Sequence, residues 1–362
     1  MANTTKAESK YSLLETNLKE QLNWQRARIN CLVLMITAIC KVKTVCFERL
    51  AEAMDSEAKV TSRHRRIQRF FAGFLIDKDL ISKFLFSLLP HQTDLTLSID
   101  RTNWKFGKTD INIFMLSVCY DGMAMPVMWT MLPKKGNSNS LERIDLIERF
   151  IRLFGKNCIA SVVADREFIG DKWLSWLSLN SLPFHIRIRD NMWFGKPNGE
   201  LLKMSWILQG QKLYTIYNHP RMLFLDNNLV YVSGMKLQNN EYLIIVSFNK
   251  QEEAISSYKN RWQIETMFKA FKTNGFNVED THLSDLKRID KLITLVSIAF
   301  IWAYKTGIHI HLYVEPIKLK KHGRKANSFF KLGLRHLTNA FLVQFYLINN
   351  LVKLLSVLRF LR

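Results

Sequence analysis

The chain has 362 residues, with 52 Lys and Arg against 31 Asp and Glu, which gives a formal net charge of +21 at pH 7. A content of 48% hydrophobic and 12% aromatic residues excludes an intrinsically disordered chain. Seven Pro and fourteen Gly exclude collagen-like and low-complexity material. The length predicts two or three domains.

The positive charge favours a polyanionic partner, because each phosphate that a basic side chain neutralises releases counterions. The basic residues are spread over the whole chain. A membrane-surface protein more often concentrates them in one amphipathic segment. We therefore expect a nucleic acid as the partner, ahead of a membrane surface.

The cysteines and the apolar runs indicate where the protein works. Five cysteines without a CxxC pair predict free thiols in a reducing compartment. The first residues are polar, so we expect no secretory signal. The apolar runs Cys31–Cys40 and Leu292–Tyr304 are shorter than the roughly 20 residues of a spanning helix and predict core helices. We expect a soluble, cytoplasmic protein.

Residues 1–90 are predicted to be mostly helical. The expected helical segments are Glu15–Arg28, Cys31–Ala53, Thr61–Phe71 and Phe74–Leu89. In the third of these, Thr61 or Ser62 is the expected N-cap. Its basic side would carry Arg63, Arg66 and Arg69, and its apolar side Ile67, Phe70 and Phe71. Such a helix suits packing on its own domain while docking on DNA, although a merely solvated basic face is the alternative.

The pattern changes to β-rich at residue 94. Alternating and apolar runs separated by helical patterns predict a mixed α/β sheet. The expected strands are Leu95–Asp100, Ile111–Tyr120, Met123–Leu132, Ile159–Ala164 and Phe184–Ile188, with helices over Leu141–Phe154 and Phe168–Leu179. Asp121-Gly122 predicts a hairpin turn. Residues 191–248 predict a β insertion, with strands at Leu213–Tyr217, Met222–Leu225, Leu229–Val232 and Tyr242–Phe248. Helices are expected over Gln251–Thr273 and Leu283–Lys305, before a basic C-terminal segment.

Three acidic residues are candidates for a catalytic site. Asp100 and Asp165 each end an expected strand, so they would converge at one edge of the sheet, where ligands of α/β sheets bind. Either one alone is as well explained as a turn residue or helix cap. Glu265 lies on the expected helix with Tyr258, Arg261 and Lys272 at spacings of three, four and seven, which places all four on one face. The alternative is an ordinary solvated helix with i,i+4 pairs.

Three carboxylates near clustered cations suit metal-dependent phosphodiester chemistry. Mg²⁺ prefers oxygen ligands and keeps positions open for water and phosphate. Two such ions about 4 Å apart can activate a nucleophile and stabilise a leaving oxygen. Basic side chains would hold the flanking phosphates.

The spacing Tyr258-x2-Arg261-x3-Glu265-x6-Lys272, together with Asp165-Arg-Glu-Phe168 and the strand-borne Asp100, resembles the DDE transposases of bacterial insertion sequences. Specifically, the chain resembles insertion-sequence family four, with its Tyr-Arg-Glu-Lys signature. The resemblance covers about residues 60–335 and is specific, because all four signature residues match at the family's spacing.

The resemblance implies a ribonuclease H-like catalytic core with a β insertion between the second Asp and the Glu. It implies that Asp100, Asp165 and Glu265 bind the metal, expected to be Mg²⁺ with Mn²⁺ as a substitute. It also implies that Tyr258, Arg261 and Lys272 contact transposon-end DNA. Arg63, Arg66 and Arg69 are expected to add DNA contacts.

The function implied is cleavage and strand transfer by a cut-and-paste route, on terminal inverted repeats and target DNA, by a homodimer in the bacterial cytoplasm near the nucleoid. We expect a helical DNA-binding domain over 1–90, the core over 91–285 and a basic helical region over 286–362. A metal nuclease or resolvase on the same core, and a non-catalytic DNA-binding derivative, are the alternatives; the three acids and the full signature argue against the derivative.

Other residues carry weaker signals. A Trp of the family's β insertion can stack on a flipped base, but no motif surrounds Trp193 or Trp206, and core packing is the expectation for both. Trp262 is expected to anchor its helix. His309 and His311 could form a metal pair but have no third ligand nearby, and Glu167 is expected to support Asp165 or cap a helix.

Overall fold

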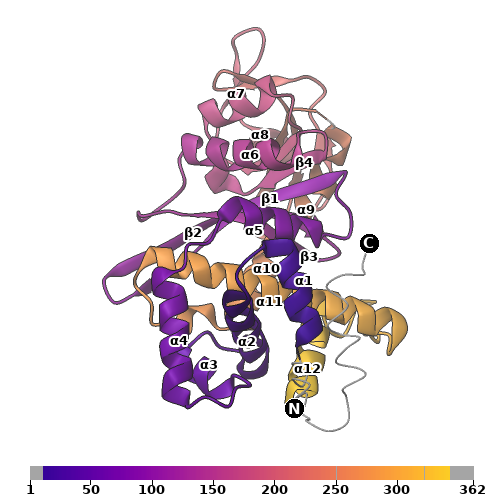
Figure 1. The fold of residues 1–362 in the computed structure, drawn as a ribbon. Helices are drawn as coiled ribbons and strands as arrows, with labels where there is room; N and C mark the ends of the chain where they lie inside the picture. Colours follow the sequence, from indigo (N-terminus) through magenta and orange to yellow (C-terminus); the bar gives the residue numbers. More distant parts are fainter. Residues whose placement is uncertain (1–10, 250, 322, 343–362) are drawn as a thin grey trace, which may run out of the picture. The chain divides into compact units, whose positions relative to one another are not determined.

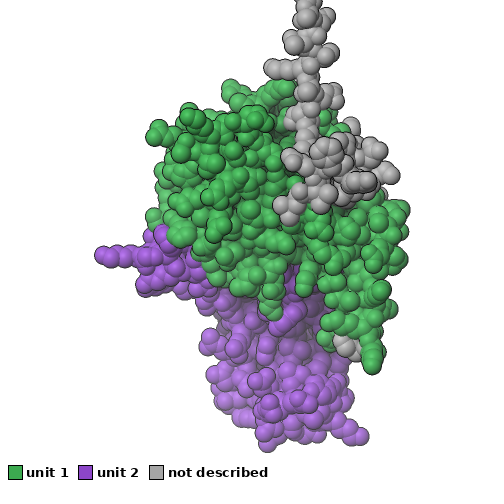
Figure 2. Space-filling model, turned by 90° about the horizontal axis from the view of Figure 1, so that it is seen from below, with its two compact units in different colours: residues 1–91, 268–362 green, residues 92–267 purple. Residues whose placement is uncertain are grey.

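The computed structural model describes residues 11–249, 251–321 and 323–342, which form two compact units (Figure 2). Unit 1 takes the described parts of residues 1–91 and 268–362, and unit 2 takes those of residues 92–267. The N-terminal and C-terminal regions, which the sequence divided into two domains, thus belong to one unit. The roles expected of those domains stay predictions.

Unit 1 is built from helices (Figure 1). They are α1 Ser12–Leu22, α2 Arg26–Val42, α3 Phe47–Ala53, α4 Val60–Gly73, α5 Lys78–Ser87, the 3-10 turn η4 Val278–Asp280, α11 Leu286–Tyr313 and α12 Phe329–Leu342. The helix expected over Glu15–Arg28 is wrong, because Asn23 takes a left-handed conformation at φ 48° and ends α1. Lys43, at φ 55°, ends α2 in the same way.

The N-caps expected in α4 are also wrong. The cap of α4 is Lys59, whose side chain accepts no hydrogen bond from the helix. The apolar side of the helix is as predicted, because Ile67, Phe70 and Phe71 are buried. The core helix expected over the apolar run Leu292–Tyr304 is confirmed as well. The helix α11 extends beyond this run at both ends.

α11 has 28 residues and is the single described helix whose length and composition would allow it to cross a membrane. Of its apolar window, 89% is buried inside the structure, as in a core helix. Its packing against α12 is close, since a Cβ built on Gly307 would lie 1.8 Å from the carbonyl oxygen of Phe329. A glycine is needed here because no side chain fits between the two backbones.

Unit 2 is a mixed sheet with helices (Figure 1). Its core strands are β1 Leu95–Phe106, β2 Thr109–Tyr120, β3 Met123–Met131, β4 Ile159–Ala164 and β5 Phe184–Ile188. Its later strands are β6 Phe194–Gly195, β7 Leu201–Leu202, β8 Tyr217–Asn218, β9 Leu223–Leu225, β10 Asn228–Lys236 and β11 Tyr242–Ser247. The helices are α6 Ser140–Phe154, η1 Arg166–Phe168, α7 Asp171–Leu179, α8 Met204–Gln209, η2 Gln238–Asn240, η3 Gln251–Glu253 and α9 Ala254–Lys259, and α10 Trp262–Phe271 runs from unit 2 into unit 1.

The strand order of the sheet is β3-β2-β1-β4-β5-β11-β10-β9-β6-β7, with β8 on β10. Strands β1, β4 and β5 run parallel, while β2, β3 and β11 pair antiparallel with their neighbours. The order 3-2-1-4-5 with an antiparallel second strand is the ribonuclease H-like arrangement that the resemblance implied. The expected β-rich segment joins this same sheet, because β11 pairs with β5.

Local signals placed several elements correctly. The bounds of β4 and β5 are as predicted, and Asp121-Gly122 forms the hairpin turn with φ values of 40° and 83°. The cap of α6 is Asn139, in a capping box with Glu142. The strand expected at Leu213–Tyr217 is wrong, since Leu213 forms only an isolated bridge with Lys236 and regular pairing with β10 begins at Tyr217.

Candidate active site

The register of two adjacent parallel strands, β1 and β4, brings Asp100 and Asp165 side by side. Ile99 of β1 pairs with Ala164 of β4, and each aspartate is the next residue. Asp165 follows the end of β4, as expected. Asp100 does not end its strand, because β1 keeps its antiparallel partner β2 and continues to Phe106. The expected convergence at one edge of the sheet is therefore produced by the β1–β4 register.

The two aspartates are held in the same way. Oδ1 of Asp100 accepts the backbone N–H of Arg101 at 2.7 Å, and Oδ1 of Asp165 accepts that of Arg166 at 2.8 Å. In both residues the other oxygen, Oδ2, lies on the side of Arg261, at 3.7 Å and 4.0 Å from its Nη1. Each aspartate thus presents one carboxylate oxygen to the same cation.

Glu265 completes the cluster from α10. Its Oε1 lies 2.5 Å from Nη2 of Arg261, an i,i+4 ion pair. The guanidinium of Arg261, whose side chain is 8% exposed, therefore has all three acidic side chains within 4.0 Å. The structure brings together the three acids that the sequence singled out, around one positive charge.

The helix that carries these groups is broken. The sequence predicted one helix over Gln251–Thr273, but α9 ends at Lys259 and α10 starts at Trp262. Between them the N–H of Arg261 donates to the carbonyl of Tyr258, three residues back, at 3.0 Å. The single continuous helix is therefore wrong, but Tyr258, Arg261 and Glu265 still meet at one cluster, because the Arg261 guanidinium lies 5.7 Å from the Tyr258 ring centroid and pairs with Glu265.

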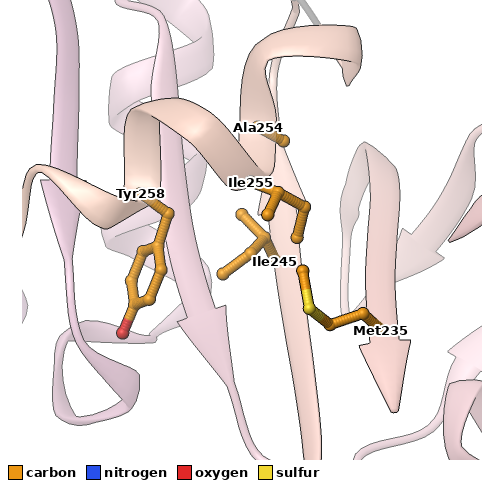
Figure 3. Close-up of a cluster of buried hydrophobic side chains, with 5 residues drawn as sticks. All are labelled: Met235, Ile245, Ala254, Ile255 and Tyr258. Atoms are coloured by element: carbon orange, nitrogen blue, oxygen red, sulfur yellow. The ribbon is translucent and has the colours of Figure 1, made fainter. Parts of the chain in front are cut away.

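Tyr258 links the cluster to the hydrophobic core. Its ring belongs to a buried group with Met235, Ile245, Ala254 and Ile255, which fixes α9 on β10 and β11 (Figure 3). Its hydroxyl donates to Oδ1 of the second aspartate at 3.2 Å. Burial raises the pKa of Tyr258 to about 12, so the phenol stays a proton donor at neutral pH.

Burial disfavours the ionised form of the Asp100 side chain. Desolvation raises its pKa to about 7, although the N–H of Arg101 and the charge of Arg261 act in the opposite direction. The charges of Glu167 and Asp165 raise this pKa further. An ionised Asp100 is therefore stabilised by any cation placed beside Oδ2.

The donor set fits a divalent cation, since carboxylate oxygens are the ligands that Mg²⁺ takes. Among the described residues, however, no three His, Cys, Asp or Glu side chains are close enough together to hold a metal ion as they stand. Arg261 supplies the positive charge between Asp100, Asp165 and Glu265. These three residues are the ones that would hold the ion.

Lys272 falls in unit 1, beyond the end of α10, where its Nζ lies 2.7 Å from Oε1 of Glu279. Of the three N-terminal arginines, Arg63 and Arg66 donate to neighbouring carbonyl or amide oxygens of their own unit, and Arg69 is exposed. Arg65, which the sequence analysis did not single out, is also exposed and lies one turn before Arg69.

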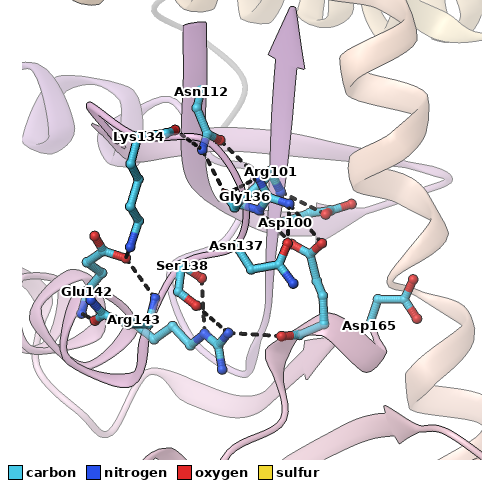
Figure 4. A network of polar contacts seen from close by, with 12 residues as sticks. Asp100, Arg101, Asn112, Lys134, Gly136, Asn137, Ser138, Glu142, Arg143 and Asp165 are labelled. Carbon is cyan, nitrogen blue, oxygen red and sulfur yellow. Dashed lines mark hydrogen bonds and ion pairs between the residues drawn. The ribbon is translucent and has the colours of Figure 1, made fainter. Parts of the chain in front are cut away.

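Sequence reasoning missed the polar network beside the aspartates (Figure 4). Arg101 forms a bidentate pair with Glu167, at 2.8 and 3.0 Å. Arg143 donates to the backbone oxygens of Glu167 and Ile169. The signal in the sequence was an Arg directly after Asp100 and a Glu two residues after Asp165.

Three expectations for tryptophans are wrong. Trp193 and Trp206 contact each other with ring centroids 5.2 Å apart, but they are 45% and 56% exposed and do not pack in the core. The Nζ of Lys203 lies 4.3 Å from the Trp193 ring centroid. Trp262 is 57% exposed and is no core anchor.

The histidine pair is occupied by local contacts. His309 lies against the ring of Tyr313, with centroids 5.1 Å apart, and Nδ1 of His311 accepts the N–H of Ile317 at 2.8 Å. Neither contact supports a metal site. The five cysteines are free thiols, as predicted, and burial raises the pKa of the Cys119 thiol to about 12.

A ribonuclease H-like sheet with one aspartate on β1 and another directly after β4 is the arrangement expected of a DDE-type core. The chain matches the family model described as "Transposase DDE domain" over residues 91–302, more than half of its length, and it belongs to this family. Transposases of this kind cut and join DNA and generally use divalent metal ions.

Comparison with curated proteins gives no match. Among solved structures, the chain is similar to the piggyBac transposase in a synaptic complex with hairpin DNA, determined by cryo-EM. The TM-score is 0.47 at 12% sequence identity, and the alignment covers 98% of this chain and 83% of that chain.

Proposed function

We propose that the chain is the transposase of an insertion sequence of family four, carrying the Tyr-Arg-Glu-Lys signature. In this proposal it binds terminal inverted repeats and catalyses metal-dependent cleavage and strand transfer by a cut-and-paste route. The observation that carries the proposal is the gathering of Asp100, Asp165 and Glu265 within 4.0 Å of one guanidinium.

The two aspartates and the four signature residues each have a role in this proposal. The three acids would hold Mg²⁺, for which Mn²⁺ would substitute, and such an ion would supply Lewis-acid chemistry for phosphodiester cleavage. Tyr258 orients Asp165 through its hydroxyl and contacts the transposon end. Arg261 and Lys272 bind phosphates of the same DNA.

The remaining proposals concern partners and place. The net charge of +21 favours double-stranded DNA, both transposon ends and target. Residues 1–90 and 286–362 supply further DNA contacts, including Arg63, Arg66 and Arg69 of α4. Two copies of the chain hold two ends in the synapse, in the bacterial cytoplasm at the nucleoid.

The test uses the full chain and labelled duplexes that carry its own element ends. Asp100→Ala, Asp165→Ala and Glu265→Ala are each expected to abolish cleavage in Mg²⁺ while specific end binding, measured by footprinting, survives. Lys156→Ala, an exposed cation on another surface of the sheet unit, is the matched control and should cut normally. Full cleavage by any one of the three acidic variants would overturn the assignment, and cleavage without strand-transfer products would favour a plain nuclease.

A further inference from the structure

We propose that Arg101 is a positioning residue, which holds the Glu167 carboxylate away from the metal-binding carboxylates Asp100 and Asp165. This inference rests on the proposed function, because it takes the two aspartates as metal ligands. It concerns a residue outside the acidic triad and the signature helix.

Arg101 and Glu167 lie close to the two aspartates in the sequence. Arg101 directly follows Asp100 on β1, and Glu167 lies in η1, two residues after Asp165. Their ion pair therefore ties together the two segments that carry the aspartates. Glu167 is near enough for its negative charge to act on Asp100, whose pKa it raises. A fourth carboxylate thus belongs to the same electrostatic environment as the triad.

Every N–H of the Arg101 guanidinium has an acceptor. Nε and Nη2 donate to the two oxygens of Glu167, at 2.8 and 3.0 Å. Nη2 also donates to Oδ1 of Asn137 at 2.7 Å. Nη1 donates to Oδ1 of Asn112 at 3.1 Å and to the carbonyl of Gly136 at 2.7 Å. Because an arginine has five N–H donors, this side chain has none left for DNA.

The backbone of Glu167 is fixed from the other side by Arg143, which is 4% exposed. Its Nη2 donates to the carbonyl of Glu167 at 2.9 Å, and its Nη1 to that of Ile169 at 3.0 Å. It is held in turn by Ser138, whose hydroxyl accepts from Nε at 3.0 Å. With its backbone and both side-chain oxygens bound, Glu167 keeps one orientation.

This arrangement limits how many carboxylates face the ion. The affinity of an oxygen site for divalent cations depends on the number of charged ligands and on rigidity. Without Arg101, the Glu167 carboxylate would lose both of its charged hydrogen bonds and would be attracted to any cation beside Asp100. Arg101 therefore determines that three acids, and not four, form the site.

The experiment is a calorimetric titration of Mn²⁺ into the DNA-free full-length protein. Arg101→Ala is expected to raise the Mn²⁺ affinity about tenfold, and adding Glu167→Ala to it is expected to return the affinity to that of the wild type. A lower affinity in Arg101→Ala, or a gain that Glu167→Ala does not reverse, would overturn the proposal. A residue that merely supported the fold would not produce this reversal.

Two conservative variants keep the test valid if Arg101→Ala folds poorly. Glu167→Gln should leave the Mn²⁺ affinity of the wild-type background unchanged within twofold, and a tenfold loss would show that Glu167 is itself a ligand and overturn the proposal. Arg101→Lys, which keeps the charge but loses the two-pronged geometry, should give an affinity between those of the wild type and Arg101→Ala. An affinity unchanged from the wild type in both Arg101 variants would count against the proposal.

Matched controls separate this inference from the proposed function. Lys134→Ala removes the Lys134–Glu142 ion pair of the same network and should lower Tm without changing Mn²⁺ affinity. Asp100→Asn should abolish Mn²⁺ binding. If Asp100→Asn binds Mn²⁺ like the wild type, the proposed metal ligands are wrong; if it does not bind while Arg101→Ala is unchanged, only the role of Arg101 is wrong.

Discussion

Nη1 of Arg261 lies 3.7 Å from Oδ2 of Asp100, and this guanidinium forms a hydrogen bond with Glu265 alone among the acids around it. Its Nε is buried without an acceptor in the described part of the chain. Arg101 differs, because all its N–H groups are bound. Of the two arginines beside Asp100, Arg261 is therefore the one that can change partners at small cost.

A divalent ion among the three acids would compete with Arg261. At an effective dielectric constant of about 20, a doubly charged ion about 4 Å from a guanidinium is repelled by roughly 8 kcal/mol. We predict that Arg261→Ala lowers the Tm of the metal-free protein, because the acids lose their cation. We also predict that saturating Mn²⁺ raises the Tm of this variant more than that of the wild type. Thermal melts with and without Mn²⁺ measure both effects.

Lys259→Ala is the control for this prediction, since it removes an exposed cation from the adjacent α9. Its Mn²⁺-dependent shift in Tm should equal that of the wild type. A smaller shift in Arg261→Ala than in the wild type would contradict competition between the guanidinium and the ion.

The proposed contacts of Arg261 and Lys272 with DNA predict a change in salt dependence. Each phosphate contact contributes close to one to the slope of log affinity against log salt. Arg261→Ala and Lys272→Ala should therefore each reduce the slope for end binding by about 1. Because the Glu279 partner of Lys272 is 37% exposed, the second variant should lose less than about 1 kcal/mol of stability. Unchanged slopes in both variants, with stability clearly lost, would show that these residues serve the fold.

The sheet and the acidic triad could be predicted because their signals are local or periodic. The wholly apolar run of β4 and the Asp-Gly turn depend on a few adjacent residues. Asp100 and Asp165 were expected together as strand-end residues, and they do lie together, although Asp100 lies inside β1 and the β1–β4 register brings the two side by side. The proximity of the two aspartates could be expected without knowing any side-chain contact.

The break between α9 and α10 could not be predicted from periodicity. The residues on either side keep helical spacing, while at the break the N–H of Arg261 bonds three residues back to Tyr258, whose ring packs into the cluster on β10 and β11. The contacts of Arg101 were equally hidden, because its acceptors come from segments 11 to 66 residues away. Only the folded chain brings these groups together.

Lys305 of α11 predicts a pH dependence of stability. It is 3% exposed, and burial lowers its pKa from 10.5 to about 8. Between pH 8 and 10.5 the unfolded chain therefore binds more protons than the folded one, so stability should rise with pH in this range. Below pH 8 the full cost of the buried charge remains. Lys305→Met should thus raise the free energy of unfolding at pH 7 by about 1–3 kcal/mol and remove the rise above pH 8, as measured by urea denaturation across this pH range. A destabilised Lys305→Met at pH 7 would show that the ammonium has a stabilising partner.

The arginines of α4 predict a division between folding and DNA binding. Arg63 donates through Nε and Nη1 to the carbonyls of Ala58, Ala51, Glu52 and Met54, at 2.7–3.2 Å, and so caps the end of α3. Arg63→Ala should therefore cost about 2 kcal/mol or more of stability, because these oxygens lose a charged donor.

Arg65 and Arg69 lie one turn apart on the exposed side of the same helix, while Ile67 and Phe70 hold its other side in the core. Arg65→Ala/Arg69→Ala should keep Tm within a few degrees and weaken footprinting of the cognate end, with a salt slope reduced by about 2. Point variants are needed here, because residues 1–91 share their compact unit with residues 268–362 and a truncation would remove part of that core. If the double variant protects cognate and scrambled ends as the wild type does, end recognition does not use this face of α4, and the basic segment that follows α11 becomes the next surface to test.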